Sequence, residues 1–120
     1  MSAKVKVRHT GDIAILELGG RITLGEGSGT IRNTIKDLVA GGSRKILVNL
    51  HDVTYLDSAG LGELVGSYAT LTNLGGQIKL LHPQGKVTDM LTVTKLYTIF
   101  TSYTDEELAI RSFTSGAASA

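Results

Sequence analysis

The feature that most constrains the fold is an aliphatic run in the middle of the chain, Lys45–Leu50, which Asn49 alone interrupts. Such a run is typical of a strand covered on both faces. Apolar residues recur at helical spacing before it, through Ile31–Val39, and after it, through Leu61–Leu71. A further apolar strand, Gln77–Leu81, follows. Because a strand, helix and strand of this length form a right-handed crossover, the sequence predicts an α/β domain with parallel strands.

Two strands are expected before the first helix. In Lys4–Arg8, valines alternate with basic residues, which is the pattern of a strand with one exposed face. Ile13–Leu18 is more apolar, and Thr10-Gly11-Asp12 between them has the composition of a turn. The chain therefore opens with a hairpin.

The C-terminal part is predicted from weaker signals. Pro83 is expected to open a third helix, since the first helical position needs no amide hydrogen. Residues 97–103 form a plausible short strand, and Thr104 with Glu107 matches a capping box that begins a fourth helix. The prediction is thus one domain, 1–113, with a mixed, mostly parallel sheet of four to five strands packed with four helices, and a flexible tail, 114–120.

Composition restricts the function. The chain has 15 glycines in 120 residues, which exceeds the average of about 7%, but most of them punctuate predicted elements, so we reject a disordered chain. A net charge of +1 argues against direct nucleic-acid binding. The absence of cysteine excludes disulfides and thiolate metal sites. No apolar run is long enough to be a signal peptide or a membrane span, so we expect a cytoplasmic protein without direct membrane insertion.

Three patterns that could carry catalysis or ligand binding are weak. The Gly25–Thr30 segment precedes a helix as a phosphate loop does, but it lacks the lysine of a P-loop. The three histidines lie far apart and at no metal-ligand spacing, so we expect neither a metal nor a cofactor. Ser58 with His51 and Asp57 is a poor triad, because Asp57 adjoins the serine instead of orienting the histidine from its far side.

The segment Asp57–Gly62 follows the central strand, at the edge of an α/β sheet where sites usually lie. Asp57 or Ser58 can cap the following helix. Gly60 and Gly62 would each cost about 1 kcal/mol in its first turn, which suggests that a partner approaches closely there. A serine at this position is accessible to a kinase, and the helix dipole tolerates its phosphate.

These residues resemble the STAS domains of sulfate transporters and anti-sigma factor antagonists, in particular the small bacterial antagonists. The resemblance covers residues 4 to 113. It rests on Gly19-Gly20-Arg21-Ile22, on the central strand, on Leu74-Gly75-Gly76 and, most specifically, on Asp57-Ser58-Ala59-Gly60-Leu61-Gly62.

The resemblance implies a non-enzymatic protein in a partner-switching pathway. The unphosphorylated antagonist would bind an anti-sigma factor that is also a serine kinase and so free a sigma factor. The kinase would phosphorylate Ser58, and a serine phosphatase would reverse this. Many antagonists carry an acidic residue in the loop before the first helix, where this chain has glycines. The residues expected to contact the partner are Asp57, Ser58, Ala59, Gly60, Leu61, Gly62, Thr23 and Gly25.

Other functions remain open. The same fold would serve as a scaffold subunit of a signalling assembly or as an accessory subunit of a membrane transporter. A nucleotide hydrolase using the Gly25–Thr30 segment is a third hypothesis. Thr54 offers another hydroxyl near the same edge, but we expect Ser58 to be the main phosphoacceptor.

Overall fold

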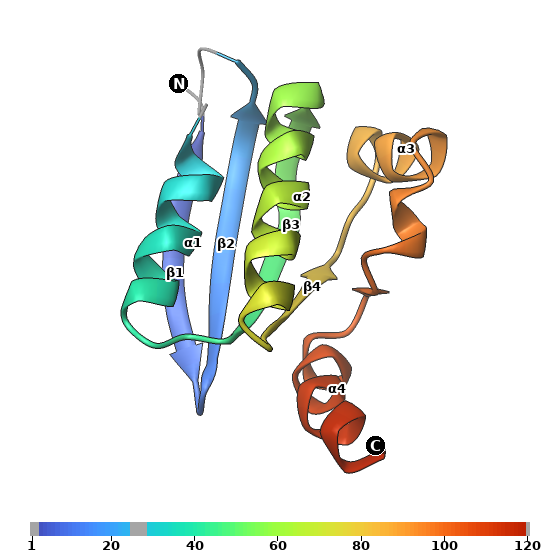
Figure 1. Cartoon of the computed structure of the whole chain (residues 1–120). Coiled ribbons are helices and arrows are strands. Elements are labelled where there is room, and N and C mark those ends of the chain that lie inside the picture. The colour runs from blue at the N-terminus through green and yellow to red at the C-terminus, as the bar shows by residue number, and fades with distance from the viewer. Residues whose placement is uncertain (1–2, 25–28, 120) are drawn as a thin grey trace.

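The computed structural model describes residues 3–24 and 29–119, with side chains up to residue 114. The chain folds as the predicted α/β domain (Figure 1). Its described elements are β1 (Lys4–Thr10), β2 (Ile13–Ile22), α1 (Thr30–Ala40), β3 (Lys45–Leu56), α2 (Ser58–Asn73), β4 (Gln77–Leu81), α3 (Lys86–Val93), the 3-10 helix η1 (Leu96–Thr98), β5 (Ser102–Tyr103) and α4 (Glu106–Ser119).

The five described strands form one sheet in the order β1-β2-β3-β4-β5. β1 and β2 are the antiparallel hairpin that the sequence predicts, and every later pairing is parallel. β3 lies at the centre, and its Ile46, Leu47 and Val48 are fully buried. Helices cover both faces of β3, as the continuous aliphatic run predicts.

We call the side of the sheet that carries α1, α2 and α3 the front face, and the side that carries α4 the back face. α1 and α2 run side by side across β1, β2 and β3 (Figure 1). Their apolar stripes, with Ile31, Ile35 and Leu64, pack into the main core. α4 packs Ala109 and Phe113 against a smaller cluster on the back face.

Three predictions in the C-terminal part are wrong. α3 begins at Lys86, three residues after Pro83, with Gly85 at its N-cap. Residues 97–103 are mostly non-strand, because the chain turns through η1 and only Ser102–Tyr103 pair with β4. The cap of α4 is Asp105, whose carboxylate accepts from the Leu108 amide at 3.1 Å, so the helix begins one residue later than the Thr104–Glu107 box requires.

The predicted tail, 114–120, overlaps the end of α4, whose backbone is helical to Ser119. Residue 120 lies outside the described residues. The domain limit at residue 113 and the flexibility of the tail stay predictions.

Candidate functional site

The site begins where β2 and β3 end together. The last pair in their parallel register is Ile22 with Leu56. The Asp57 amide then donates to the Ile22 carbonyl at 3.3 Å. The loop after β2 and the start of α2, which are more than thirty residues apart in sequence, therefore meet at the carboxyl edge of the sheet, where parallel α/β folds place their sites.

Asp57 ties these two segments together. Of the two caps that the sequence allows, Asp57 and Ser58, the structure has Asp57, whose side chain accepts from the Gly60 amide at 3.0 Å. Its other oxygen accepts from the Leu24 amide at 2.9 Å. The Leu24 amide, and next the Gly60 amide, hold the pKa of Asp57 below its ordinary value, because both donors favour the ionised carboxylate. At neutral pH, Asp57 is thus a fixed anion between the β2 end and α2.

Ser58 is the first residue of α2 and is exposed. Its hydroxyl makes no hydrogen bond within the described part of the chain. It therefore stands at the positive end of a 16-residue helix, beside the carboxylate of Asp57. A phosphoryl group attached there would have free space and favourable helix amides, but also a neighbouring negative charge.

The two glycines of this segment differ in their surroundings. A Cβ at Gly60 would lie 2.6 Å from Leu56 Cδ1 and 2.9 Å from the Ile22 carbonyl oxygen. Gly60 is therefore required by the close packing of α2 on the ends of β2 and β3. A Cβ at Gly62 would have no heavy atom within 4 Å. The sequence-based explanation, that a partner must come close, is needed for Gly62 alone.

The other predicted contact residues divide in the same way. Leu61 is 5% exposed and belongs to the main core, whereas Ala59 is half-buried beside the exposed Ser58. Thr23 is half-buried where β2 ends, near the Asp57 contact with Leu24. Gly25 lies outside the described residues. Partner contacts by any of these residues stay a prediction.

Glu63 was missed by the sequence analysis. It lies on α2 and is 9% exposed, and its carboxylate accepts from the Gly29 amide at 2.5 Å and the Arg32 amide at 3.0 Å. It thus caps α1 from the neighbouring helix, replacing a local cap that Gly29 cannot supply. No local spacing could have revealed this, since donor and acceptor are 34 residues apart.

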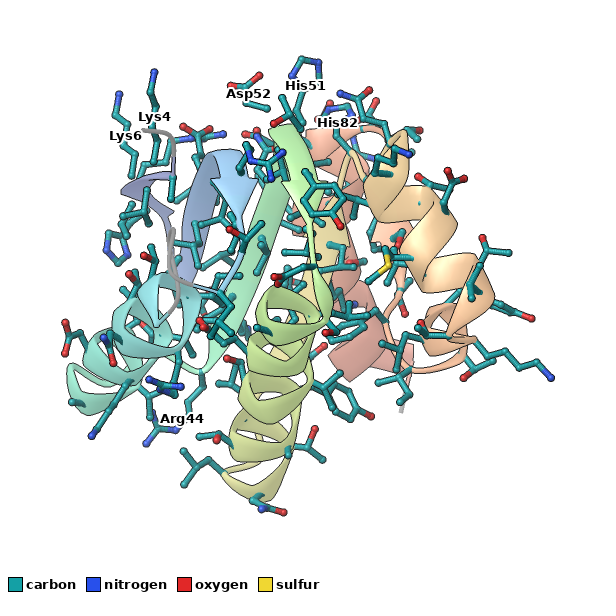
Figure 2. The ribbon with its side chains drawn as sticks, turned by 90° about the horizontal axis from the view of Figure 1, so that it is seen from above. Lys4, Lys6, Arg44, His51, Asp52 and His82 are labelled. Carbon is teal, nitrogen blue, oxygen red and sulfur yellow. The ribbon has the colours of Figure 1, made fainter. Side chains whose placement is uncertain are left out.

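The histidines do not extend the site into a catalytic centre. Figure 2 shows His51 and His82 together, and their rings meet edge to face at 5.4 Å. His51 Nδ1 contacts Asp52 Oδ1 at 2.9 Å, while both oxygens of Asp57 bind backbone amides. The triad of Ser58, His51 and Asp57 is therefore not assembled. Within the described residues, no three acidic or histidine side chains gather as a metal site.

Comparison with known proteins identifies the family. The family model for the STAS domain matches residues 4–109. The chain is a STAS domain. The resemblance based on Asp57–Gly62 is thus confirmed, together with the fold that it implies.

Three solved structures show how closely this STAS domain follows known ones. A Thermotoga maritima protein is 25% identical, with 92% of this chain and 94% of that chain covered and a TM-score of 0.81. An anti-sigma factor antagonist from Mycobacterium paratuberculosis is 19% identical, with 94% and 95% covered and a TM-score of 0.84. The phosphorylated form of the Bacillus cell fate determinant SpoIIAA is 22% identical, with 90% and 98% covered and a TM-score of 0.71.

Within the described residues, no helix is both long enough and apolar enough to cross a membrane.

Proposed function

We propose that this STAS domain is an anti-sigma factor antagonist of a partner-switching pathway, in which Ser58 is the phosphoacceptor. The observation that supports this most directly is the exposed Ser58 at the start of α2, with Asp57 fixed beside it by the amides of Leu24 and Gly60. The similar fold of SpoIIAA, a protein known in a phosphorylated form, supports the same role.

In the unphosphorylated state, the domain binds an anti-sigma factor serine kinase through the edge around Ser58. The exposed part of this edge includes Leu24, which is 76% exposed, and Gly62. The apolar Leu24 side chain is a suitable contact for a partner, because its backbone amide is already held by the Asp57 carboxylate. The domain itself carries out no chemistry; the kinase supplies ATP and a serine phosphatase reverses the reaction.

Phosphorylation releases the partner by adding charge to a surface that already holds the Asp57 carboxylate. The phosphate contributes about two negative charges at neutral pH. The α2 dipole keeps the fold tolerant of them, whereas a partner that must desolvate both groups is repelled. A loss of about 3 kcal/mol in binding free energy would lower affinity more than a hundredfold.

The modification is tested with a purified anti-sigma factor serine kinase from the same organism and Mg-ATP. Mass spectrometry should find one phosphate on Ser58, and none in Ser58→Ala. Thr54→Ala is the matched control, because Thr54 is another exposed hydroxyl near this edge, and this variant should be phosphorylated like the original protein. Phosphate on Thr54, or none at all, would contradict the assignment.

The charge mechanism is tested by calorimetric titration of the same kinase. Ser58→Asp should bind much more weakly than the original protein, whereas Ser58→Asn, which has the same shape without the charge, should bind nearly as well. Equal affinities for the aspartate and asparagine variants would show that charge at residue 58 does not control binding.

A further inference from the structure

A groove of about 680 Å³ lies between α1 and α2 on the front face. Apolar atoms predominate in its lining, which includes Ile35 and Val39 from α1 and Ala59 from α2. It follows both helices from Leu24 and Ala59 at one end to Val39 and Thr70 at the other. The eleven residue steps from Ala59 to Thr70 correspond to about 16 Å, or three helical turns.

Small residues on α2 keep this groove open. Gly62 and Gly66 both line it, and a Cβ at either would have no heavy atom within 4 Å. Alanine would therefore fit in the free protein, and it is a better helix former than glycine. Packing within the domain explains Gly60 but does not explain these two glycines. Their missing side chains instead allow another backbone to approach α2 closely.

The exposed charged side chains that line the groove are both basic. Arg32 and Lys36 lie on its α1 wall and are exposed, and neither pairs with a carboxylate within the described part of the chain. The one acidic side chain in the lining is Glu63, whose two oxygens are occupied by the Gly29 and Arg32 amides. An occupant thus meets an apolar floor flanked by two cations that have no carboxylate partner among the described residues.

We propose that this groove is a docking site for an amphipathic helix of a partner protein, apolar on one face and carrying Asp or Glu along its edge. The three-turn length, the apolar floor and the close approach allowed at Gly62 and Gly66 suit a third helix packed beside two others. Arg32 and Lys36 select an acidic helix over a basic one. This goes beyond the proposed function, because it assigns a second kind of partner to the groove between the helices; only its end at Leu24, Ala59 and Gly62 is shared with the edge proposed for the kinase.

The direct test uses two synthetic helical peptides with the same leucine face, one with glutamates along its edge and one with lysines there. Titrated into the isotope-labelled protein, the glutamate peptide should shift the amide signals of Val39, Gly62 and Gly66 and reach saturation. The lysine peptide should bind at least about tenfold more weakly. Equal binding of the two, no saturation, or shifts confined to other surfaces would overturn the proposal. It would also be overturned if the groove signals moved with protein concentration alone, which would indicate a second copy as the occupant.

Matched variants locate the binding. Gly66→Leu should fill the groove and lower affinity for the glutamate peptide at least about tenfold, whereas Ala69→Leu, on an exposed part of α2 outside the groove, should not. Lys36→Glu should weaken binding, and Lys4→Glu, on β1, should leave it unchanged. If Gly66→Leu does not fold, the Lys36→Glu and Lys4→Glu pair decides. Unchanged affinity in Lys36→Glu or in a folded Gly66→Leu would overturn the proposal.

Gly66→Ala separates docking from a structural role. It should raise the thermal midpoint of the free protein, because alanine stabilises the helix, and at the same time weaken binding of the glutamate peptide. A lower midpoint would show that Gly66 serves the packing of the domain, and the proposal would lose its main support.

Discussion

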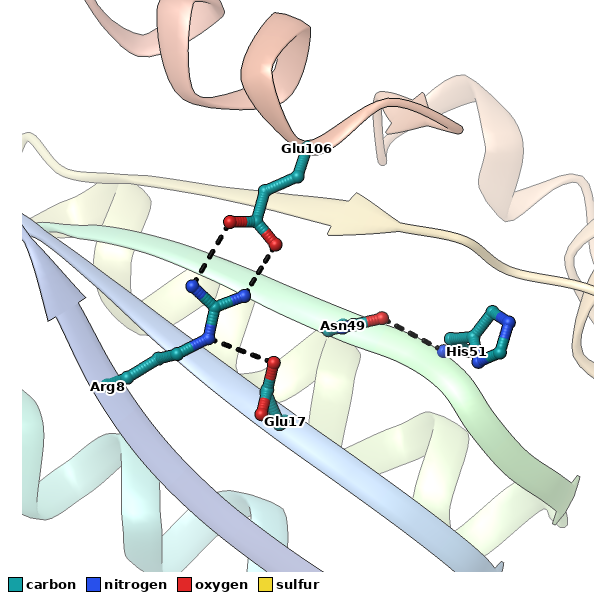
Figure 3. Close-up of polar contacts among 5 residues, drawn as sticks. All are labelled: Arg8, Glu17, Asn49, His51 and Glu106. Carbon is teal, nitrogen blue, oxygen red and sulfur yellow. Dashed lines mark hydrogen bonds and ion pairs between the residues drawn. The ribbon is translucent and has the colours of Figure 1, made fainter.

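The helices that cover the front and back faces of the sheet are held by different interactions. On the front, α1, α2 and α3 and the sheet share a core of nineteen buried residues among those described. On the back, α4 and the sheet share a cluster of six, two of them from α4 itself, and a polar cluster helps to hold the helix. In that cluster, shown in Figure 3, Arg8 of β1 contacts Glu17 of β2 at 2.9 Å and binds both carboxylate oxygens of Glu106.

The front core therefore sets the stability of the domain, whereas the back cluster only attaches α4 to it. The front core joins three strands, β2, β3 and β4, to three helices, so none of them can leave without exposing the others. α4 is held by Ala109 and Phe113 and by the contact of Glu106 with Arg8, which we call the clasp. The candidate site lies at the end of the well-buried front layer, where Asp57 and Glu63 are fixed by backbone amides. A rigid layer can present a binding edge, while the weaker layer can open without disturbing it.

The largest effect is expected from Leu64→Ala in α2, because Leu64 is fully buried in the front core. The loss of transfer energy and the cavity should lower the free energy of unfolding by about 3 kcal/mol. Denaturant titration should show one cooperative transition moved to lower concentration. A second, separate transition would show that the front layer is less unified than the packing indicates.

Phe113→Ala should cost less, about 2 kcal/mol, because α4 can detach instead of leaving a cavity. Hydrogen exchange should accelerate in α4, while the amides of β3 keep the protection they have in the original protein. Equal acceleration in β3 would show that α4 does not open independently of the front layer.

Gly60→Ala is expected to destabilise by about 1–2 kcal/mol, since the new methyl group would meet Leu56 and the Ile22 carbonyl. Gly62→Ala is the matched control, two residues away on the same helix, and should stabilise slightly because its surroundings are open. Thermal unfolding of both variants shows whether each substitution raises or lowers stability. If Gly60→Ala is stabilised instead, the end of β2 can shift to make room for the methyl group at little cost.

The smallest effect concerns the clasp on the back face. The Arg8 guanidinium holds the pKa of Glu106 below its ordinary value of 4.5. Because the folded pKa is the lower one, the stabilisation is complete above the ordinary pKa and is lost as the pH falls through the folded value. Both side chains are more than a third exposed, so the contribution is at most about 1 kcal/mol.

Acidification should therefore loosen α4 before the front layer. In NMR spectra recorded from pH 7 downwards, α4 signals should move first, and in Arg8→Gln they should already be moved at pH 7. Arg111→Gln is the control, because Arg111 pairs with Glu107 on the exposed side of α4 itself. An Arg8→Gln protein with an acid response like that of the original would show that the clasp does not hold α4.

Much of this architecture could be read from the sequence where the determinants are local. The aliphatic run of β3 and the hairpin turn depend on neighbouring residues, and both were predicted correctly. The cap of α2 is also local, and Asp57 is one of the two residues predicted for it. The start of α3 was misplaced because proline permits a helix start without requiring one, and here the chain first passes through Gly85. Asp105 and Thr104 are both good caps, so the local pattern could not choose between them.

The parts that could not be predicted join distant segments. The Leu24 amide reaches Asp57, and the Gly29 amide reaches Glu63, only after β2 and β3 have paired. The sequence assigned Gly60 and Gly62 a single cause, but their causes differ according to whether the end of β2 lies behind them. Helical periodicity indicates which residues are buried, but it does not state which backbone group approaches a given glycine.

β1 has a further consequence for how the protein behaves at high concentration. Within the described residues it pairs only with β2, so its other edge presents unpaired amides and carbonyls. Figure 2 shows Lys4 and Lys6 projecting from the sheet on the side away from α1 and α2. If two copies met along this edge, their rows of lysines would face each other without counter-charges. The basic residues thus protect the open edge from aggregation by continued strand addition.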